Sequence, residues 1–549
     1  MRRLLAATVL AGAVPLCAMG ATRGRLLLPE GKPAAGSQVS IPGIAGSVRA
    51  DANGNFVIDH RARVPFVLVV IGARGEIYPP VRIDELVAGQ TLVVQLEPTL
   101  RESVTVMSGV APNIEAPPAA GVSIVGREDL EERKPEHLVD ALARTPGIEV
   151  RGTGPAAVPV VRGLAGGRTL LLLDDARVTA ERRAGPSGTF LDPFALASVE
   201  ISRGPGSVAY GSDALGGVIH ARPRDPVLGD DAVLYQLSAA AGGRSTRSAG
   251  VEFTRGIGSG AILALVRART GDDAEDGAGR RIANSSYEDR GVALRYVRPS
   301  QSGLFRAGLA IDRGYDIEVP AVDIETTRTY YPRESSDRLT LSYDTAIGVF
   351  DIVEMRAALG SYDITTNRAT VSSGQIGSSS VDANDASLRM TVTRMTGTGR
   401  IHSGIDWVSR FGLRTDSSID DAWKRDLGFF VIYDWQALSR VLLSAGARID
   451  RVESRNEGGF FGDRSRSDTA PSGYISATYT LRTNLTASLQ ASSGYRDPTL
   501  SDRYFRGVSG RGFVVGNPEL EPERSLQFDG ALRWQSADRS LALLGYRYQ

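Results

Sequence analysis

Apolar and polar residues alternate in repeated runs along the second part of the chain, from residue 227 to residue 549. Successive side chains of a strand point to opposite faces, so each run predicts a β-strand with one apolar and one polar face. The clearest runs are Val292–Tyr296, Phe305–Ile311, Leu339–Tyr343 and Leu485–Ala491. We count about fifteen runs of about ten residues each, separated by turns and charged loops, which is typical of a transmembrane β-barrel. A soluble sandwich has the same period of two, so the pattern alone leaves both architectures open.

A second pattern covers residues 22–98, where short β-rich runs alternate with turns at the spacing of a small β-sandwich. The clearest turn contains Asn53 and Gly54, because these two residues tolerate the positive φ angles of a tight hairpin. Residues 99–118 include Pro112, Pro117 and Pro118 and few residues that could anchor a core. This stretch therefore predicts a linker.

Residues 1–21 have the pattern of a secretory signal peptide. Arg2 and Arg3 precede the apolar stretch 4–16, and small residues lead up to Ala21. The single cysteine, Cys17, lies inside this segment, so we expect the exported protein to contain no thiol and no disulfide. No later stretch has the roughly eighteen consecutive apolar residues of a spanning helix, so a location within a membrane would require a β-barrel.

The charge balance argues against nucleic acid as a partner. Lysine and arginine total 63, aspartate and glutamate total 63, and the formal net charge is zero. Proteins that bind nucleic acid need a basic excess to neutralise phosphates. We therefore expect no nucleic-acid partner.

The sequence offers little catalytic chemistry. No histidine is followed by glutamate as in a zinc-peptidase helix, and there is no Gly-x-Ser-x-Gly nucleophile elbow. Asp174 and Asp175 could form a carboxylate pair, but neighbours in a strand point to opposite faces. We expect no enzyme, no metal site and no cofactor.

Residues 119–226 predict a segment of mixed helices and strands. We expect amphipathic helices at 127–130 and 136–144 and strands at 148–151, 158–162 and 169–174. The stretch Val199–His220 has a β-type run at each end and is rich in glycine between them, so it must turn tightly. It lacks the lysine of a Walker loop and the glycine spacing of a dinucleotide fingerprint, so it is not a phosphate-binding loop.

The sequence YGSDALGGVI at Tyr210–Ile219, after the Arg-Gly-Pro of Arg203–Pro205, resembles the closing signature of the plug domain of TonB-dependent outer-membrane receptors. His220 and Asp175 depart from the pattern, which usually has Asn and Gly at these positions. The resemblance implies a mostly β chain: an α+β plug at 119–226 inside an antiparallel transmembrane barrel at 227–549. Residues 22–98 resemble the carboxypeptidase-regulatory-like sandwich that precedes some plugs, and a generic immunoglobulin-like spacer is the alternative.

Inside the linker, a short β-prone segment resembles the TonB box of these receptors. Its residues are Glu102, Ser103, Val104, Thr105 and Val106. An extended segment with β-branched side chains can add a strand to the sheet of a partner. The resemblance implies that TonB, the energy-coupling protein of the inner membrane, binds here.

The resemblance also implies contacts between plug and barrel and a place for the ligand. We expect Arg162 and Arg203 to meet Glu523 and Asp529 of the barrel wall, with Arg203 pairing to Glu523. At the outer face we expect the plug loop 181–188 to present Arg182 and Arg183 to an anionic ligand. An external loop carrying Tyr330 and Tyr331 would complete this ligand site.

The function implied by the resemblance is active uptake of a scarce ligand across the outer membrane, with the sandwich in the periplasm and lipid around the barrel. A ferric siderophore or vitamin B12 is the expected ligand. An importer of oligosaccharide or another organic nutrient and a passive, plugged, porin-like barrel are the alternatives. Plugged transporters of this kind have about twenty-two strands, so we expect further strands after Gln549.

Overall fold

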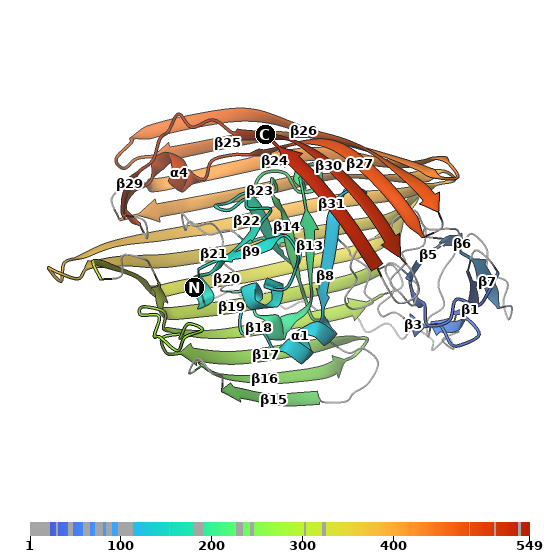
Figure 1. Cartoon of the computed structure of the whole chain (residues 1–549), viewed down its shortest axis with the longest axis horizontal. Helices are drawn as coiled ribbons and strands as arrows, with labels where there is room; N and C mark the ends of the chain where they lie inside the picture. The colour runs from blue at the N-terminus through green and yellow to red at the C-terminus, as the bar shows by residue number, and fades with distance from the viewer. Residues whose placement is uncertain are drawn as a thin grey trace, which may run out of the picture.

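One curved sheet of fifteen strands contains most of the second half of the chain (Figure 1). The computed structural model describes residues 22–28, 31–41, 48–58, 66–71, 81–83, 91–96, 114–152, 154–178, 190–226, 234–241, 246–300, 303–320, 325–416, 418–482, 484–509, 512–535 and 540–549. The strands of the sheet, in spatial order, are β15 (Leu234–Ala241), β16 (Thr246–Ile257), β17 (Gly260–Gly271), β18 (Tyr287–Pro299), β19 (Gly303–Val319), β20 (Thr327–Ile347), β21 (Phe350–Thr370), β22 (Ile376–Thr396), β23 (Gly399–Thr415), β24 (Asp420–Leu438), β25 (Val441–Glu457), β26 (Asp463–Arg482), β27 (Leu485–Arg496), β30 (Glu523–Gln535) and β31 (Ser540–Tyr548). Neighbouring strands are antiparallel, and β15 and β31 form the two edges, so the described strands leave the sheet open.

The alternation predicted for this sheet is confirmed. On β27, Leu489 is 71% exposed on the outer face, whereas its neighbours Ser488 and Gln490 are 2% and 5% exposed on the inner face. The strands are longer than the ten residues we expected, and β20 reaches 21 residues. They are longer because the alternating part, which includes Leu339 and Leu341, continues at one end into a polar extension.

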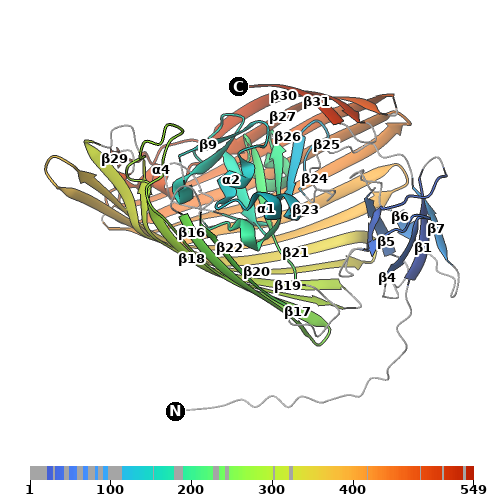
Figure 2. The same cartoon turned by 60° about the horizontal axis from the view of Figure 1, so that its bottom comes forward.

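The plug lies on the concave side of this sheet (Figures 1 and 2). Its main sheet has five strands in the order β12-β11-β14-β13-β8, and β11 and β14 are parallel. The plug elements are β8 (Gly121–Gly126), α1 (Arg127–Arg133), α2 (Leu138–Leu142), β9 (Ile148–Arg151), η1 (Gly154–Ala156), β10 (Val158–Val161), β11 (Thr169–Leu173), β12 (Ala176–Arg177), η2 (Pro193–Ala195), β13 (Leu196–Arg203), α3 (Ser207–Tyr210) and β14 (Gly217–Pro223). The predicted α+β plug is therefore confirmed as a fold.

The turn between β13 and β14 contains a helix that the sequence did not predict. The four residues of α3, Ser207–Tyr210, are all buried. Four residues are too few to show helical periodicity, and the surrounding glycines favoured a simple turn. No helix among the described residues is long and apolar enough to cross a membrane.

The N-terminal residues form two small sheets that face each other. One has the order β4-β1-β7 and the other β3-β2-β5-β6. Their strands are β1 (Thr22–Leu27), β2 (Gln38–Ser40), β3 (Val48–Arg49), β4 (Asn55–Ile58), β5 (Phe66–Ile71), β6 (Val81–Ile83) and β7 (Leu92–Gln95). Leu26, Val39 and Leu68, from both sheets, share one buried core, as in a β-sandwich. The likeness to a carboxypeptidase-regulatory-like domain stays a prediction.

The molecule has two distinct ends. The N-terminal sandwich lies beyond one end of the curved sheet (Figure 1). Near the other end, the segment between β27 and β30 contains α4 (Leu500–Tyr504) and the hairpin of β28 (Arg506–Ser509) and β29 (Gly512–Val515). We call these the sandwich end and the α4 end.

Candidate functional site

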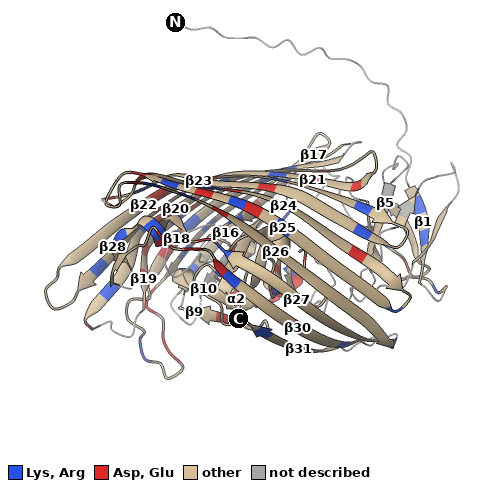
Figure 3. Ribbon diagram, turned by 90° about the horizontal axis from the view of Figure 1, so that it is seen from above, with Lys and Arg blue, Asp and Glu red and all other residues tan. Residues whose placement is uncertain are grey.

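Charged side chains occupy both surfaces where the plug meets the sheet. Figure 3 shows basic and acidic residues side by side along the strands. A buried charge is costly unless it has a partner, so ion pairs are expected to cross this interface. The pairs that do so include Glu115–Arg400, Arg162–Asp529, Arg168–Glu523, Asp174–Arg295, Asp175–Arg356, Asp192–Arg267 and Asp213–Arg496.

The structure brings together Arg162 and Asp529, two of the residues selected from the sequence. Arg162 follows β10 and has a φ of 54°, a left-handed conformation that turns its side chain toward the sheet. Its Nη1 lies 2.6 Å from Asp529 Oδ1, and both side chains are buried. The guanidinium carbon also lies 4.2 Å from the centre of the Tyr546 ring, close enough for a cation–π contact.

The expected pairing of Arg203 with Glu523 is wrong. Arg203 donates instead to the carbonyl oxygen of Pro146, at 2.8 Å, within the plug. Burial and two nearby arginines lower the pKa of Arg203 to about 10. Glu523 accepts hydrogen bonds from Arg168 Nε at 2.7 Å and from Arg496 Nη1 at 3.0 Å. Arg168 lies outside the plug motif, so no pattern in the sequence distinguishes it from other arginines.

Asp174 and Asp175 form the two-residue turn between β11 and β12, where both have positive φ angles of 52° and 67°. A strand would have directed these side chains to opposite faces, but in the turn both reach the sheet. Asp174 pairs with Arg295 of β18 and accepts a hydrogen bond from Thr340 at 2.8 Å. Asp175 accepts from Arg356 Nε of β21 at 3.0 Å. The substitution of aspartate for the usual glycine thus adds a contact to the sheet while keeping the turn.

His220 lies behind this turn and is fully buried. The backbone N–H of Asp175 donates to His220 Nε2 at 3.1 Å, so this nitrogen is unprotonated and the ring is neutral. Burial, reinforced by nearby Arg222, lowers the pKa of His220 to about 3. Burial would raise the pKa of Asp175, but Arg222 and Arg356 hold it well below its usual value.

Glu115 marks the point where the chain enters the plug from the linker. Its carboxylate accepts two hydrogen bonds from Arg400 of β23, at 2.7 and 2.9 Å, and its backbone N–H donates to the Tyr210 hydroxyl at 2.8 Å. Arg400 is next to the short turn that joins β22 to β23. A single glutamate in a linker has no sequence signal, so this contact was not predicted.

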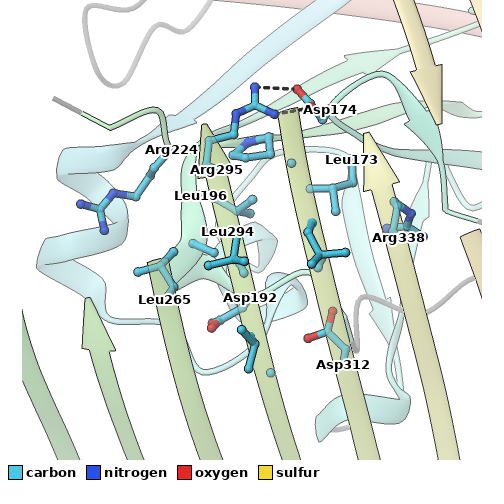
Figure 4. A pocket seen from close by; sticks show the side chains of 18 of the residues that line it. Leu173, Asp174, Asp192, Leu196, Arg224, Leu265, Leu294, Arg295, Asp312 and Arg338 are labelled. Carbon is cyan, nitrogen blue, oxygen red and sulfur yellow. Dashed lines mark hydrogen bonds and ion pairs between the residues drawn. The ribbon is translucent and has the colours of Figure 1, made fainter. Parts of the chain in front are cut away.

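A cavity of about 80 Å³ lies between the plug and strands β17–β20 (Figure 4). On the plug side it is lined by apolar residues that include Leu173, Phe194 and Leu196. The sheet contributes Leu263, Leu265 and the small residues Gly291, Ala293, Gly308 and Ala310. Charged groups lie around this apolar lining, among them the Asp174–Arg295 pair drawn in Figure 4.

The expected external loop with Tyr330 and Tyr331 is a strand. Both residues belong to β20, which continues further than its alternating pattern predicted. The Tyr331 side chain is 8% exposed and packs in an apolar cluster that includes Tyr504 of α4, whereas the Tyr330 hydroxyl accepts from Asn367 at 3.0 Å. Arg182, Arg183 and the predicted TonB box, residues 102–106, lie outside the described residues.

Comparison with known families agrees with this architecture. A model of the TonB-dependent receptor plug domain matches residues 115–218, and a model of the TonB-dependent receptor-like β-barrel matches residues 279–549. The chain belongs to the TonB-dependent receptor family. This family is of the receptor and transporter type, and its curated members include outer-membrane proteins.

Two curated relatives illustrate the range of the receptor family. The iron-regulated outer membrane virulence protein of Vibrio cholerae is 26% identical over 467 residues, which cover 80% of this chain and 67% of that protein. The vitamin B12 transporter BtuB of Vibrio vulnificus is 31% identical over 149 residues, 27% of this chain and 24% of that protein.

Solved structures share the fold of this receptor. The copper transporter OprC matches with a TM-score of 0.65 and 19% identity, covering 77% of this chain and 71% of OprC. The siderophore receptor PiuA from Acinetobacter baumannii matches with a TM-score of 0.60 and 13% identity, covering 78% of this chain and 72% of PiuA. The names of these relatives refer to iron, copper, siderophores and vitamin B12.

We predict that Arg162→Leu destabilises the plug of this receptor by about 3–5 kcal/mol, because Asp529 is left buried and unpaired. The double variant Arg162→Leu, Asp529→Leu should recover most of this loss. Both effects are measured by unfolding the protein in urea and following the unfolding of the plug by hydrogen exchange in β10. Additive losses in the double variant would show that the two side chains do not interact.

We predict that Asp175→Gly weakens the attachment of the plug to β21, although glycine relieves the left-handed backbone by about 1–2 kcal/mol. Arg356 keeps Asp344 as a partner, so the lost contact should cost about 1.5–3 kcal/mol. Faster hydrogen exchange in β11 and β12 is the expected result. Asp175→Asn, which suits the turn but lacks the charge, is the matched control and should show the same faster hydrogen exchange as the glycine variant. Slower exchange in the glycine variant would mean that strain dominates.

We predict that the plug loses stability as the pH falls from about 6.5 to 5, because the unfolded chain protonates His220 and the folded plug does not. The slope from this residue should approach about 1.4 kcal/mol per pH unit. In the variant His220→Asn, the pH dependence of stability that comes from His220 should be absent. Urea midpoints at pH 7 and pH 5 test the difference, and equal pH dependence in both proteins would refute it.

Proposed function

We propose that this protein is a receptor in the outer membrane that binds a scarce ligand at the α4 end and imports it when TonB pulls on the linker at the sandwich end. The attachment of Glu115 to Arg400 carries this proposal. It fixes the chain to the sheet one residue after the start of the described segment 114–152, on the side from which a pull would arrive.

The many ion pairs across the interface favour an energised mechanism. Ion pairs join the plug region to strands along the whole sheet, from Arg224–Glu252 at β16 to Arg162–Asp529 at β30. Ligand binding at one face would have to overcome several of these pairs at once. A mechanical pull can break them one after another, starting at the linker.

For the ligand, we propose a ferric siderophore or cobalamin. The resemblance of the plug motif and the names of the relatives support this choice. Arg182 and Arg183 of the plug are the proposed contacts for an anionic ligand. An importer of oligosaccharide or another nutrient would use the same plug and the same energy source.

We predict that Val104→Pro abolishes uptake without changing ligand binding at the cell surface. Proline removes a backbone donor and fixes φ, so the added strand with TonB cannot form. Radiolabelled ferric catecholate siderophores and radiolabelled cobalamin, tested on cells with the full-length receptor, measure both properties. Ser108→Pro, in the same linker but outside the box, is the matched control and should retain uptake.

The outcomes separate the alternatives. Uptake that survives both Val104→Pro and removal of a proton gradient would indicate a passive, plugged barrel. Binding of neither probe, with energised uptake of an oligosaccharide, would assign the receptor to another nutrient.

A further inference from the structure

The cavity between the plug and strands β17–β20 owes its space to small residues. On the inner face of β18 and β19 the lining residues Gly291, Ala293, Gly308 and Ala310 are small, whereas the neighbouring β17 contributes Leu263 and Leu265, the latter opposite Ala293. Apolar plug residues close the opposite side (Figure 4). The cavity therefore has an apolar body whose volume of about 80 Å³ holds roughly two to three waters.

Four arginines line this cavity, and three of them are neutralised by carboxylates. Arg224 pairs with Glu252, and Arg295 pairs with Asp174 and Asp225. Arg267 pairs with three aspartates: Asp192, Asp289 and Asp312. These three positive charges are already used by the protein.

The fourth arginine, Arg338 of β20, is different. It is half-buried, lines the cavity, and has no hydrogen bond or ion pair to any other described residue. Asp312 and Asp385 are the carboxylates whose negative charge acts on Arg338. Both already have partners, since Asp312 accepts from Arg267 at 2.8 Å and Asp385 accepts from Arg410 at 2.8 and 2.9 Å.

An unpaired guanidinium beside an apolar cavity has a defined chemical complement. The planar guanidinium binds a carboxylate through two parallel hydrogen bonds, and the bonds are stronger where water is largely excluded. The apolar lining favours a short hydrocarbon chain next to that carboxylate. A neutral molecule would leave the guanidinium without a partner.

We propose that this cavity is a binding site for a short-chain carboxylate, with the carboxylate on Arg338 and the carbon chain between the plug and β18–β19. The site lies within the barrel interior, apart from the outer-face contacts proposed for the ligand. The carboxylate comes either from a free acid or from an acidic group of the transported ligand, and the two sources share this chemistry.

Binding of sodium butanoate to the purified full-length receptor tests the proposal by isothermal titration calorimetry and saturation-transfer NMR. We expect butanoate to bind, and n-butanol, which has the same chain without the charge, to bind at least tenfold more weakly. Arg338→Gln should weaken butanoate binding at least tenfold, and Arg338→Lys should retain part of it. Arg298→Gln, an exposed arginine on β18, controls for loss of charge and should bind as the unaltered protein does.

A second variant tests the cavity without changing the arginine. Ala310→Leu enlarges a side chain of the apolar lining and should exclude butanoate while Arg338 stays in place. Hydrogen exchange of the plug in each variant verifies that it is folded. Absence of butanoate binding in the unaltered protein, or equal affinity in Arg338→Gln, would overturn the proposal.

The source of the carboxylate is decided by adding butanoate to the uptake assay. If the site receives an acidic group of the ligand, butanoate slows uptake and Arg338→Gln reduces it. If the site receives a free acid, uptake is unchanged while Arg338→Gln still loses butanoate. Both results support the site and distinguish its source, and both can be read even if the TonB box is assigned wrongly, because butanoate binding needs no energy source.

Discussion

The requirement that each buried charge finds a partner determines how the plug and the sheet fit together. The sheet has an apolar outer face, so its polar residues are directed inward, where Arg267, Arg295 and Arg356 would be costly if left alone. The plug supplies carboxylates at matching positions, and plug arginines meet carboxylates of the sheet in return. The interface is therefore specific without being strongly apolar. Because each pair involves distant parts of the chain, the plug can take this position only when the sheet has its correct register.

The turn at Asp174 and Asp175 shows how this requirement outweighs local backbone preference. Two successive non-glycine residues in left-handed conformations cost energy that a glycine would avoid. Each aspartate, however, neutralises an arginine on a different strand of the sheet. His220 completes the arrangement from behind by accepting the N–H of Asp175, which a charged ring could not do. The two departures from the family pattern, at positions 175 and 220, are thus in direct contact, which a sequence comparison alone does not reveal.

The sequence was sufficient to predict the architecture but not most of the ion pairs between plug and sheet. Alternation with a period of two depends only on local geometry, so the fifteen strands and their inner and outer faces could be predicted. The partner of Glu523 depends on which plug loop faces β30, and Arg168 was not distinguishable from other arginines until both elements were placed. Similarly, the role of Glu115 could be recognised only after Arg400 had been placed. The end of β20 could not be located from the sequence because polar strand and polar loop have the same composition.

The ion pairs also give the two edges of the plug sheet different connections to the barrel sheet. In the order β12-β11-β14-β13-β8, the edge strand β8 follows directly after Glu115, whereas the turn with Asp174 and Asp175 belongs to the opposite edge. Under the proposed pull from the linker, the pair of Glu115 with Arg400 bears the load first and β8 follows. The β11–β12 edge has its own ion pairs to β18 and β21, so it can stay in place while β8 separates. Since the cavity beside Arg338 lies against this retained edge, its walls would persist at a stage when the other side of the plug has opened.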